Sequence, residues 1–147
     1  MYRNLLVPVD GSDLSDKAMH GSIDLARQLG ATITAFVAEP TPPLPAVGRT
    51  ARMIEIENDL HDERTTRHAQ EVLRRFEAQA RDAGVAFQGH HAQTPSIGDA
   101  IVDAAKEHGC DLIVMATHGR GLIGEMLYGA HTKGVMARSK LPLLVLH

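Results

Sequence analysis

Short strand-like segments alternate with longer amphipathic segments along this chain. The strand-like segments are rich in apolar or β-branched residues, as in strands covered on both faces, and they span residues 3–9, 32–37, 85–91, 111–115 and 141–146. Helical patterns are predicted between them, over residues 15–29, 54–83, 97–108 and 131–139. Strands that alternate with helices predict βαβ units, a parallel sheet and right-handed crossovers.

Capping and breaking residues mark the expected ends of these elements. Ser12 or Asp13 can cap the first helix, Gly30 is its expected C′ stop, and Ser96 can cap the helix over 97–108. Prolines at positions 40, 42, 43 and 45 exclude a helix or a central strand there. This proline-rich segment fits either a lid over a ligand crevice or a stiff connector.

The expected fold is an α/β domain with an open five-stranded parallel sheet. We expect helices on both faces in a Rossmann-like arrangement and a single domain over residues 1–147, and we take 3-2-1-4-5 as the strand order, which the alternation alone does not fix. Ligands of such sheets bind at the carboxyl ends of the strands, where the strand order reverses. The first and fourth strands flank that point, which places residues 8–10 opposite residues 115–119.

Composition narrows the possible functions. The chain is 44% hydrophobic and 22% charged, which is ordinary for a soluble globular protein. Its net charge of −3, its 3% aromatic content and its lack of tryptophan argue against nucleic-acid binding. No apolar run approaches the ~20 residues that span a bilayer. The single cysteine, Cys110, excludes an internal disulfide and fits a reducing compartment, so a cytoplasmic protein is expected.

The segment A-T-H-G-R-G-L-I-G-E-M-L-Y-G-A, residues 116–130, carries the strongest chemical signal. It connects a predicted strand to a predicted helix, and its four glycines let backbone N–H groups approach an anion. The segment therefore indicates nucleotide or phosphate binding. His118 and Arg120 are either phosphate ligands or solvated loop residues. A tight connection that binds no ligand is the alternative interpretation.

The sequence provides no evident catalytic group. The segment lacks the lysine and the Ser/Thr of a P-loop, and the chain contains no G-x-S-x-G elbow. No general base is evident for a γ-phosphate, so no catalytic residue is assigned and at most slow ATP hydrolysis is expected. His118 and His131 lack a neighbouring carboxylate cluster, so no metal site is predicted.

Three separated motifs resemble the universal stress protein family over essentially the whole chain. They are L-L-V-P-V-D-G-S near the start, D-L-I-V-M-A-T-H-G-R in the fourth strand and L-P-L-L-V-L at the end. The resemblance implies a five-stranded parallel sheet and a homodimer formed through the last strand. It also implies a nucleotide-responsive regulatory protein of the stress response, acting on a client protein that the chain does not identify.

Members of that family that bind ATP carry G-x2-G-x9-G-[S/T], and others bind no nucleotide. The corresponding positions here are Ala116, Gly119, Gly129 and Ala130, so two of the four depart from the motif. Ala130 lacks a hydroxyl for phosphate or Mg²⁺, a loss of about 1 kcal/mol or roughly fivefold in affinity. An imidazole donor from His131 can replace that contact. The resemblance thus implies weak binding of ATP or another adenine nucleotide, and a nucleotide-free dimeric interaction module is the alternative.

The resemblance also implies the positions of the binding and dimer residues. Residues 8–10, at the end of the first strand, would line the adenine and ribose side, and Val37 would pack on the base. The other residues of the set would line the ribose and phosphate side. The implied nucleotide-binding set is Pro8, Val9, Asp10, Val37, Met115, Ala116, His118, Gly119, Arg120, Gly129, Ala130 and His131. An apolar edge strand favours pairing across a two-fold axis. The expected dimer interface comprises Pro142, Leu143, Leu144, Val145 and Leu146.

Overall fold

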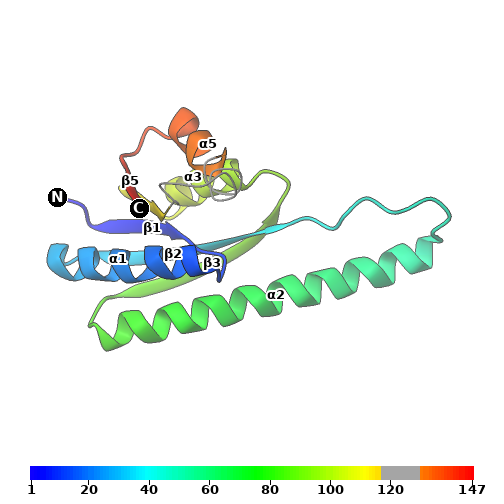
Figure 1. Cartoon of the computed structure of the whole chain (residues 1–147), viewed down its shortest axis with the longest axis horizontal. Coiled ribbons are helices and arrows are strands. Elements are labelled where there is room, and N and C mark those ends of the chain that lie inside the picture. Colours follow the sequence, from blue (N-terminus) through cyan, green and yellow to red (C-terminus); the bar gives the residue numbers. More distant parts are fainter. Residues whose placement is uncertain (117–129) are drawn as a thin grey trace.

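The computed structural model describes residues 1–116 and 130–147 and contains one five-stranded parallel sheet (Figure 1). The strand order is β3-β2-β1-β4-β5, so the predicted order 3-2-1-4-5 is confirmed. The elements, in chain order, are β1 (Asn4–Pro8), α1 (Asp13–Leu29), β2 (Thr32–Pro40), α2 (Ala51–Asp82), β3 (Phe87–Thr94), α3 (Ile97–Glu107), β4 (Leu112–Ala116), α5 (Ala130–Arg138) and β5 (Leu143–Leu146).

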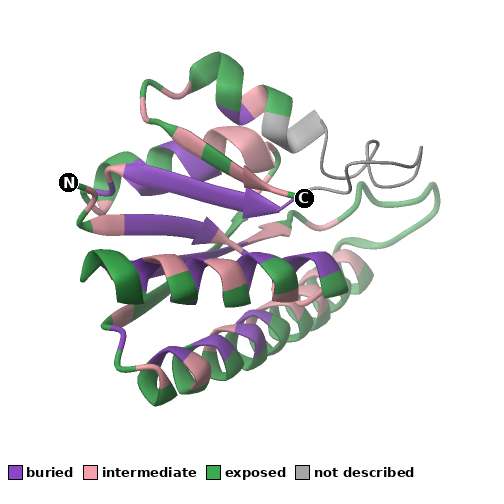
Figure 2. Ribbon diagram, turned by 60° about the vertical axis from the view of Figure 1, so that its left-hand side comes forward, coloured by how far each residue is buried: buried purple, intermediate pink, exposed green. Residues whose placement is uncertain are grey.

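Helices cover both faces of the sheet, as predicted. Successive strand residues point to opposite faces, so Leu5 and Val7 of β1 pack in the core under α1 and α2. Leu6, between them, packs in the core under α3 and α5, together with Ile101 of α3. Burial on both faces explains why the central strands are continuous apolar segments (Figure 2).

The sheet is staggered at its carboxyl edge. β1 pairs with β2 from Asn4↔Thr32 to Pro8↔Phe36. Beyond Phe36, β2 pairs only with β3, and this pairing continues to Pro40↔Thr94. The β2–β3 pair therefore projects past the end of β1 and forms a wall beside it. This wall positions the candidate site.

Two of the three expected helix ends are confirmed. The Ser12 side chain accepts a hydrogen bond from the backbone N–H of Ser15, which caps α1. Gly30 ends α1 with φ 66° in the left-handed region, and its N–H donates to the Ala26 carbonyl. Ser96 occupies the N-cap position of α3, but its side chain makes no capping bond to the helix backbone. Its hydroxyl instead lies 2.8 Å from an oxygen of Asp99, which corrects the expected role.

The third strand begins later than the sequence pattern predicts. Residues 85–91 were the expected strand, whereas β3 spans Phe87–Thr94. Val85 instead lies in the connection that follows α2, where its N–H donates to the Ala80 carbonyl and its side chain is buried. β3 extends at its other end because β2 pairs with it as far as Pro40.

The helix α2 is 32 residues long and extends past the sheet at its amino-terminal end (Figure 1). Its buried residues, Ala69, Val72, Phe76 and Ala80, all lie in its carboxyl-terminal half. Residues 41–50 run outward from the end of β2 to the start of this helix (Figure 1). In the described part of the chain, no helix is long and apolar enough to cross a membrane.

Candidate functional site

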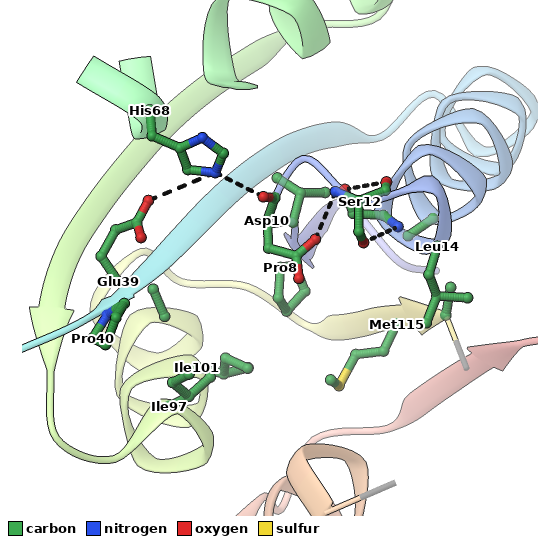
Figure 3. A pocket seen from close by; sticks show the side chains of 15 residues that line it. Pro8, Asp10, Ser12, Leu14, Glu39, Pro40, His68, Ile97, Ile101 and Met115 are labelled. Carbon is green, nitrogen blue, oxygen red and sulfur yellow. Dashed lines mark hydrogen bonds and ion pairs between the residues drawn. The ribbon is translucent and has the colours of Figure 1, made fainter. Parts of the chain in front are cut away.

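A cavity of about 380 Å³ opens at the carboxyl ends of β1, β2 and β4. This is the point where the strand order reverses, and α1 and α3 contribute further walls (Figure 3). The walls are mostly apolar and carry a few polar groups. The lining residues are Pro8, Val9, Asp10, Ser12, Leu14, Ser15, Ala18, Ala38, Glu39, Pro40, His68, Ile97, Ile101, Met115 and Ala116.

A hydrogen-bonded turn holds Asp10 at the cavity. Its Oδ1 accepts from the backbone N–H of Ser12 at 2.9 Å. The Ser15 hydroxyl accepts from the N–H of Gly11 at 3.0 Å and donates to the Ser12 carbonyl. Gly11 has φ +86°, a conformation in which a side chain is strained. The turn therefore fixes a carboxylate, an acceptor suited to hydroxyl or amino groups, at the end of β1.

Glu39 brings a second carboxylate to the cavity from the projecting end of β2. Its side chain is only 12% exposed, and its Oε1 is buried without a hydrogen-bond partner among the described residues. Burial raises the pKa of Glu39 above its ordinary value, and the nearby Asp10 carboxylate raises it further. Neighbouring His68, and after it His61 and His91, lower the pKa of Glu39.

Two histidines of α2 join the helix to the carboxyl ends of β1 and β2. His68 Nε2 lies 2.8 Å from the Asp10 carbonyl oxygen, and His61 Nε2 lies 2.9 Å from the Pro40 carbonyl oxygen. Because a carbonyl only accepts, both Nε2 atoms carry a hydrogen. His68 Nε2 also lies 4.0 Å from Oε1 of Glu39, which is an ion-pair distance but too long for a hydrogen bond (Figure 3).

The structure brings five of the predicted site residues together in this cavity. They come from the ends of β1 and β4 and are Pro8, Val9, Asp10, Met115 and Ala116. Their roles in nucleotide binding stay predictions. His118, Gly119, Arg120 and Gly129 lie outside the described residues. Ala130 and His131 begin α5, but their side chains are outside the described part of the structure.

Val37 does not line the cavity, which corrects its expected place against a base. Its side chain is 0% exposed and packs in the core between the sheet, α1 and α2. The expectation placed the end of the second strand at residue 37, whereas β2 continues to Pro40. The residues that line the cavity from this strand are therefore Ala38, Glu39 and Pro40.

The sequence analysis also missed Glu39 and His68. Glu39 follows the apolar part of the second strand, and a carboxylate at such a strand end is the signal that could have identified it. His61 and His68 are seven residues apart, so they share one face of the helix with the buried Val72. Nothing in the local sequence shows that this face reaches the cavity.

Other reactive side chains lie away from the cavity. His90 stacks on His108 with ring centroids 3.8 Å apart, and its burial lowers its pKa. Cys110 is buried in the core beneath α3, and burial raises the pKa of its thiol. Over residues 1–116 and 130–147, no group of three or more histidine, cysteine or acidic side chains is arranged to hold a metal ion.

Comparisons with known proteins agree on one family. The model of the universal stress protein family matches residues 1–147. The chain is 28% identical over 148 residues to universal stress protein MJ0531 of Methanocaldococcus jannaschii, covering 99% of this chain and 82% of that protein. It is 25% identical over 147 residues to universal stress protein YxiE of Bacillus subtilis, covering 99% of both.

Solved structures share the fold. Universal stress protein UspA from Lactobacillus plantarum superimposes with a TM-score of 0.80 at 23% identity, over 99% of this chain and 98% of that one. A universal stress protein in complex with cAMP gives 0.68 at 24% identity, over 99% and 97%. The universal stress protein from Archaeoglobus fulgidus in complex with dAMP gives 0.64 at 20% identity, over 99% and 98%.

Proposed function

The chain belongs to the universal stress protein family, and on that premise we propose that it binds an adenine nucleotide. The observation that carries the proposal is the cavity at the carboxyl ends of β1, β2 and β4, which combines apolar walls with the carboxylates of Asp10 and Glu39. Two universal stress proteins of the same fold have structures in complex with cAMP and with dAMP, which supports the choice of an adenine nucleotide.

The described residues fit such a ligand. The cavity volume of about 380 Å³ lies within the range of about 300–1,000 Å³ that small-molecule sites occupy. Pro8, Ile97 and Met115 offer an apolar surface for the base, and the Asp10 carboxylate accepts hydrogen bonds from ribose hydroxyls. None of the described lining residues is a lysine or an arginine. The phosphates would rely on the backbone of the glycine-rich segment and on Mg²⁺.

The affinity is modest in this proposal. Ala130 stands where a hydroxyl would meet phosphate, and that loss is worth about 1 kcal/mol, or roughly fivefold. Nucleotide occupancy would then bias the choice of a client protein in the stress response. No catalytic residue is assigned, so any ATP hydrolysis would be slow.

A nucleotide-free dimeric interaction module is the second candidate. It is favoured by the two departures from the ATP motif, Ala116 and Ala130, and by the lack of lysine or arginine among the described cavity residues. In this case the surface of the dimer would bind the client, and the cavity would hold no nucleotide.

Titration calorimetry of ATP with Mg²⁺, and separately of AMP, into nucleotide-stripped protein tests the proposal. We expect micromolar dissociation constants. Asp10→Ala should weaken binding by about tenfold or more, because a hydrogen bond to a charged group is worth about 1.5–3 kcal/mol. Gly119→Val, which adds a side chain at a glycine of the ATP motif, should abolish binding. Asp24→Ala, an exposed aspartate of α1 outside the cavity lining, is the control and should bind normally.

No heat change up to millimolar nucleotide, confirmed by an unchanged melting temperature, would reject nucleotide binding. The interaction module would then be the better description of the protein. Equal weakening by Asp10→Ala and by Asp24→Ala would instead move the binding site away from this cavity.

A further inference from the structure

Glu39 lines the cavity and has a buried carboxylate oxygen without a hydrogen-bond partner among the described residues. We infer that Glu39 determines base specificity: it accepts a hydrogen bond from the exocyclic amino group of adenine and disfavours purines that carry an oxo group there. This inference rests on the proposed function, since it concerns the same cavity.

Glu39 lacks a donor in the described structure. Its Oε1 is buried without a hydrogen-bond partner, although the residue lines the cavity. The imidazole N–H on His68 Nε2 lies 4.0 Å away and is already donated to the Asp10 carbonyl oxygen at 2.8 Å. A buried carboxylate without a donor is costly, and such groups are concentrated at functional sites. Because Oε1 itself has almost no accessible surface, a ligand amino group would meet the other carboxylate oxygen, or Oε1 after rotation about the last side-chain torsion, and would supply the missing donor.

The surrounding charges indicate what kind of ligand group fits. Asp10 and Glu39 are both acidic, and the repulsion between them contributes to the raised pKa of Glu39. Besides these, His68 is the only titratable side chain among the described lining residues. The ligand group that fits beside these two carboxylates is therefore a hydrogen-bond donor, not an anion or a carbonyl oxygen. An oxo group would place its lone pairs against those of the carboxylate.

Separate contacts hold the backbone segments that carry Glu39 and Asp10. Glu39 lies on the part of β2 that projects past the end of β1, and its carbonyl neighbour Pro40 is held by His61 of α2. Asp10 is held separately, by the turn that follows β1. The two carboxylates thus reach the cavity from different parts of the sheet, Asp10 from the turn after β1 and Glu39 from the end of β2. In the inferred binding mode Asp10 accepts from the ribose hydroxyls, and Glu39 accepts from the amino group of the base.

The test compares ATP with inosine triphosphate, which has an oxo group in place of the amino group. We expect the wild-type protein to bind ATP about ten- to hundredfold more tightly, the effect of one charge-assisted hydrogen bond. Glu39→Gln should reduce that ratio severalfold, because the amide can also donate to an oxo group. Glu55→Gln, an exposed glutamate of α2, is the matched control and should keep the wild-type ratio.

The outcomes separate this inference from the proposed function. Wild-type protein that binds ATP and inosine triphosphate equally would overturn the inference while nucleotide binding stands. An unchanged ratio in Glu39→Gln, with folding verified by its melting temperature, would overturn it as well. Absence of binding by either nucleotide would reject the proposed function and, with it, the base-specific role of Glu39.

Discussion

At the residue scale, the Glu39 carboxylate is placed at some cost to the fold. It is 12% exposed, has a buried oxygen without a hydrogen-bond partner among the described residues, and lies near the like charge of Asp10. His68 offsets part of this cost from 4.0 Å away. A residue that opposes folding in this way has a measurable signature in the pH dependence of stability.

Replacing Glu39 by glutamine should stabilise the fold at neutral pH. Burial raises the pKa of Glu39 in the folded state above the ordinary value of 4.5, so folding favours the protonated form. The associated stability is present below pH 4.5 and is lost as pH rises through the raised pKa. Urea unfolding should therefore show Glu39→Gln to be more stable than wild type at pH 7 and nearly equal to it at pH 4. A variant that is less stable than wild type at pH 7 would contradict this account.

The same scale shows what the sequence could and could not predict about the site. Pro8, Val9 and Asp10 were identified because an apolar strand ends there and its carboxyl end must face the crevice. The side chain of Val37 does not line the cavity, because β2 continues past it and pairs with β3 as far as Pro40↔Thr94. His68 was missed because only the tertiary packing of α2 brings it to the Asp10 carbonyl oxygen.

At the scale of elements, α2 is held unevenly along its length. Its carboxyl-terminal half packs on the sheet through Phe76, whose ring lies 5.1 Å from that of Phe87 on β3. Its amino-terminal half carries Met53, Ile56 and Leu60 as exposed side chains. His61 still connects that half to the end of β2. Stability should therefore depend strongly on position within this one helix.

Two truncations of α2 test this difference. Phe76→Ala should lower the free energy of unfolding by about 3–5 kcal/mol, because it leaves a cavity in a fully buried cluster. Leu60→Ala, at an exposed position of the same helix, should change it by about 0.5 kcal/mol or less. Urea unfolding followed by circular dichroism measures both. Similar losses for the two variants would show that the amino-terminal half is also packed.

The strands and helices and their sequence along the chain could be predicted because the spacing of apolar residues differs between strands and helices. The alternation of strands and helices does not fix the strand order; the expected order 3-2-1-4-5 is confirmed by the structure. Element ends were less predictable. Val85 looks like a strand residue, but its N–H completes the end of α2, so β3 begins only at Phe87. Such ends are fixed by hydrogen bonds that single-sequence patterns do not encode.

At the scale of the whole molecule, β5 forms one edge of the sheet. It pairs with β4 from Ile113↔Leu143 to Ala116↔Leu146 and has no second neighbour among the strands of the described residues. Leu144 on this strand is 37% exposed. An apolar edge strand offers unpaired backbone groups to a second copy of the chain. A homodimer through residues 142–146 therefore stays our prediction for the assembly.

Val145→Asp tests that assembly. A charge on the edge strand should disfavour pairing between two copies and give a monomer or insoluble protein. Light scattering coupled to size-exclusion chromatography measures the mass, and Asp103→Asn, a change on the exposed part of α3, serves as the control. A dimer that persists in Val145→Asp would place the interface elsewhere on the molecule.

The single cysteine allows the opening of the folded protein to be timed. Cys110 is buried beneath α3, and burial raises the pKa of its thiol, so a thiol-specific reagent reacts only when this part of the structure opens. Because no other cysteine competes, the labelling rate reports that one event. If opening also disrupts the cavity, a bound nucleotide should slow labelling in proportion to its occupancy. The native chain thus carries a kinetic reporter of ligand binding without any engineered label.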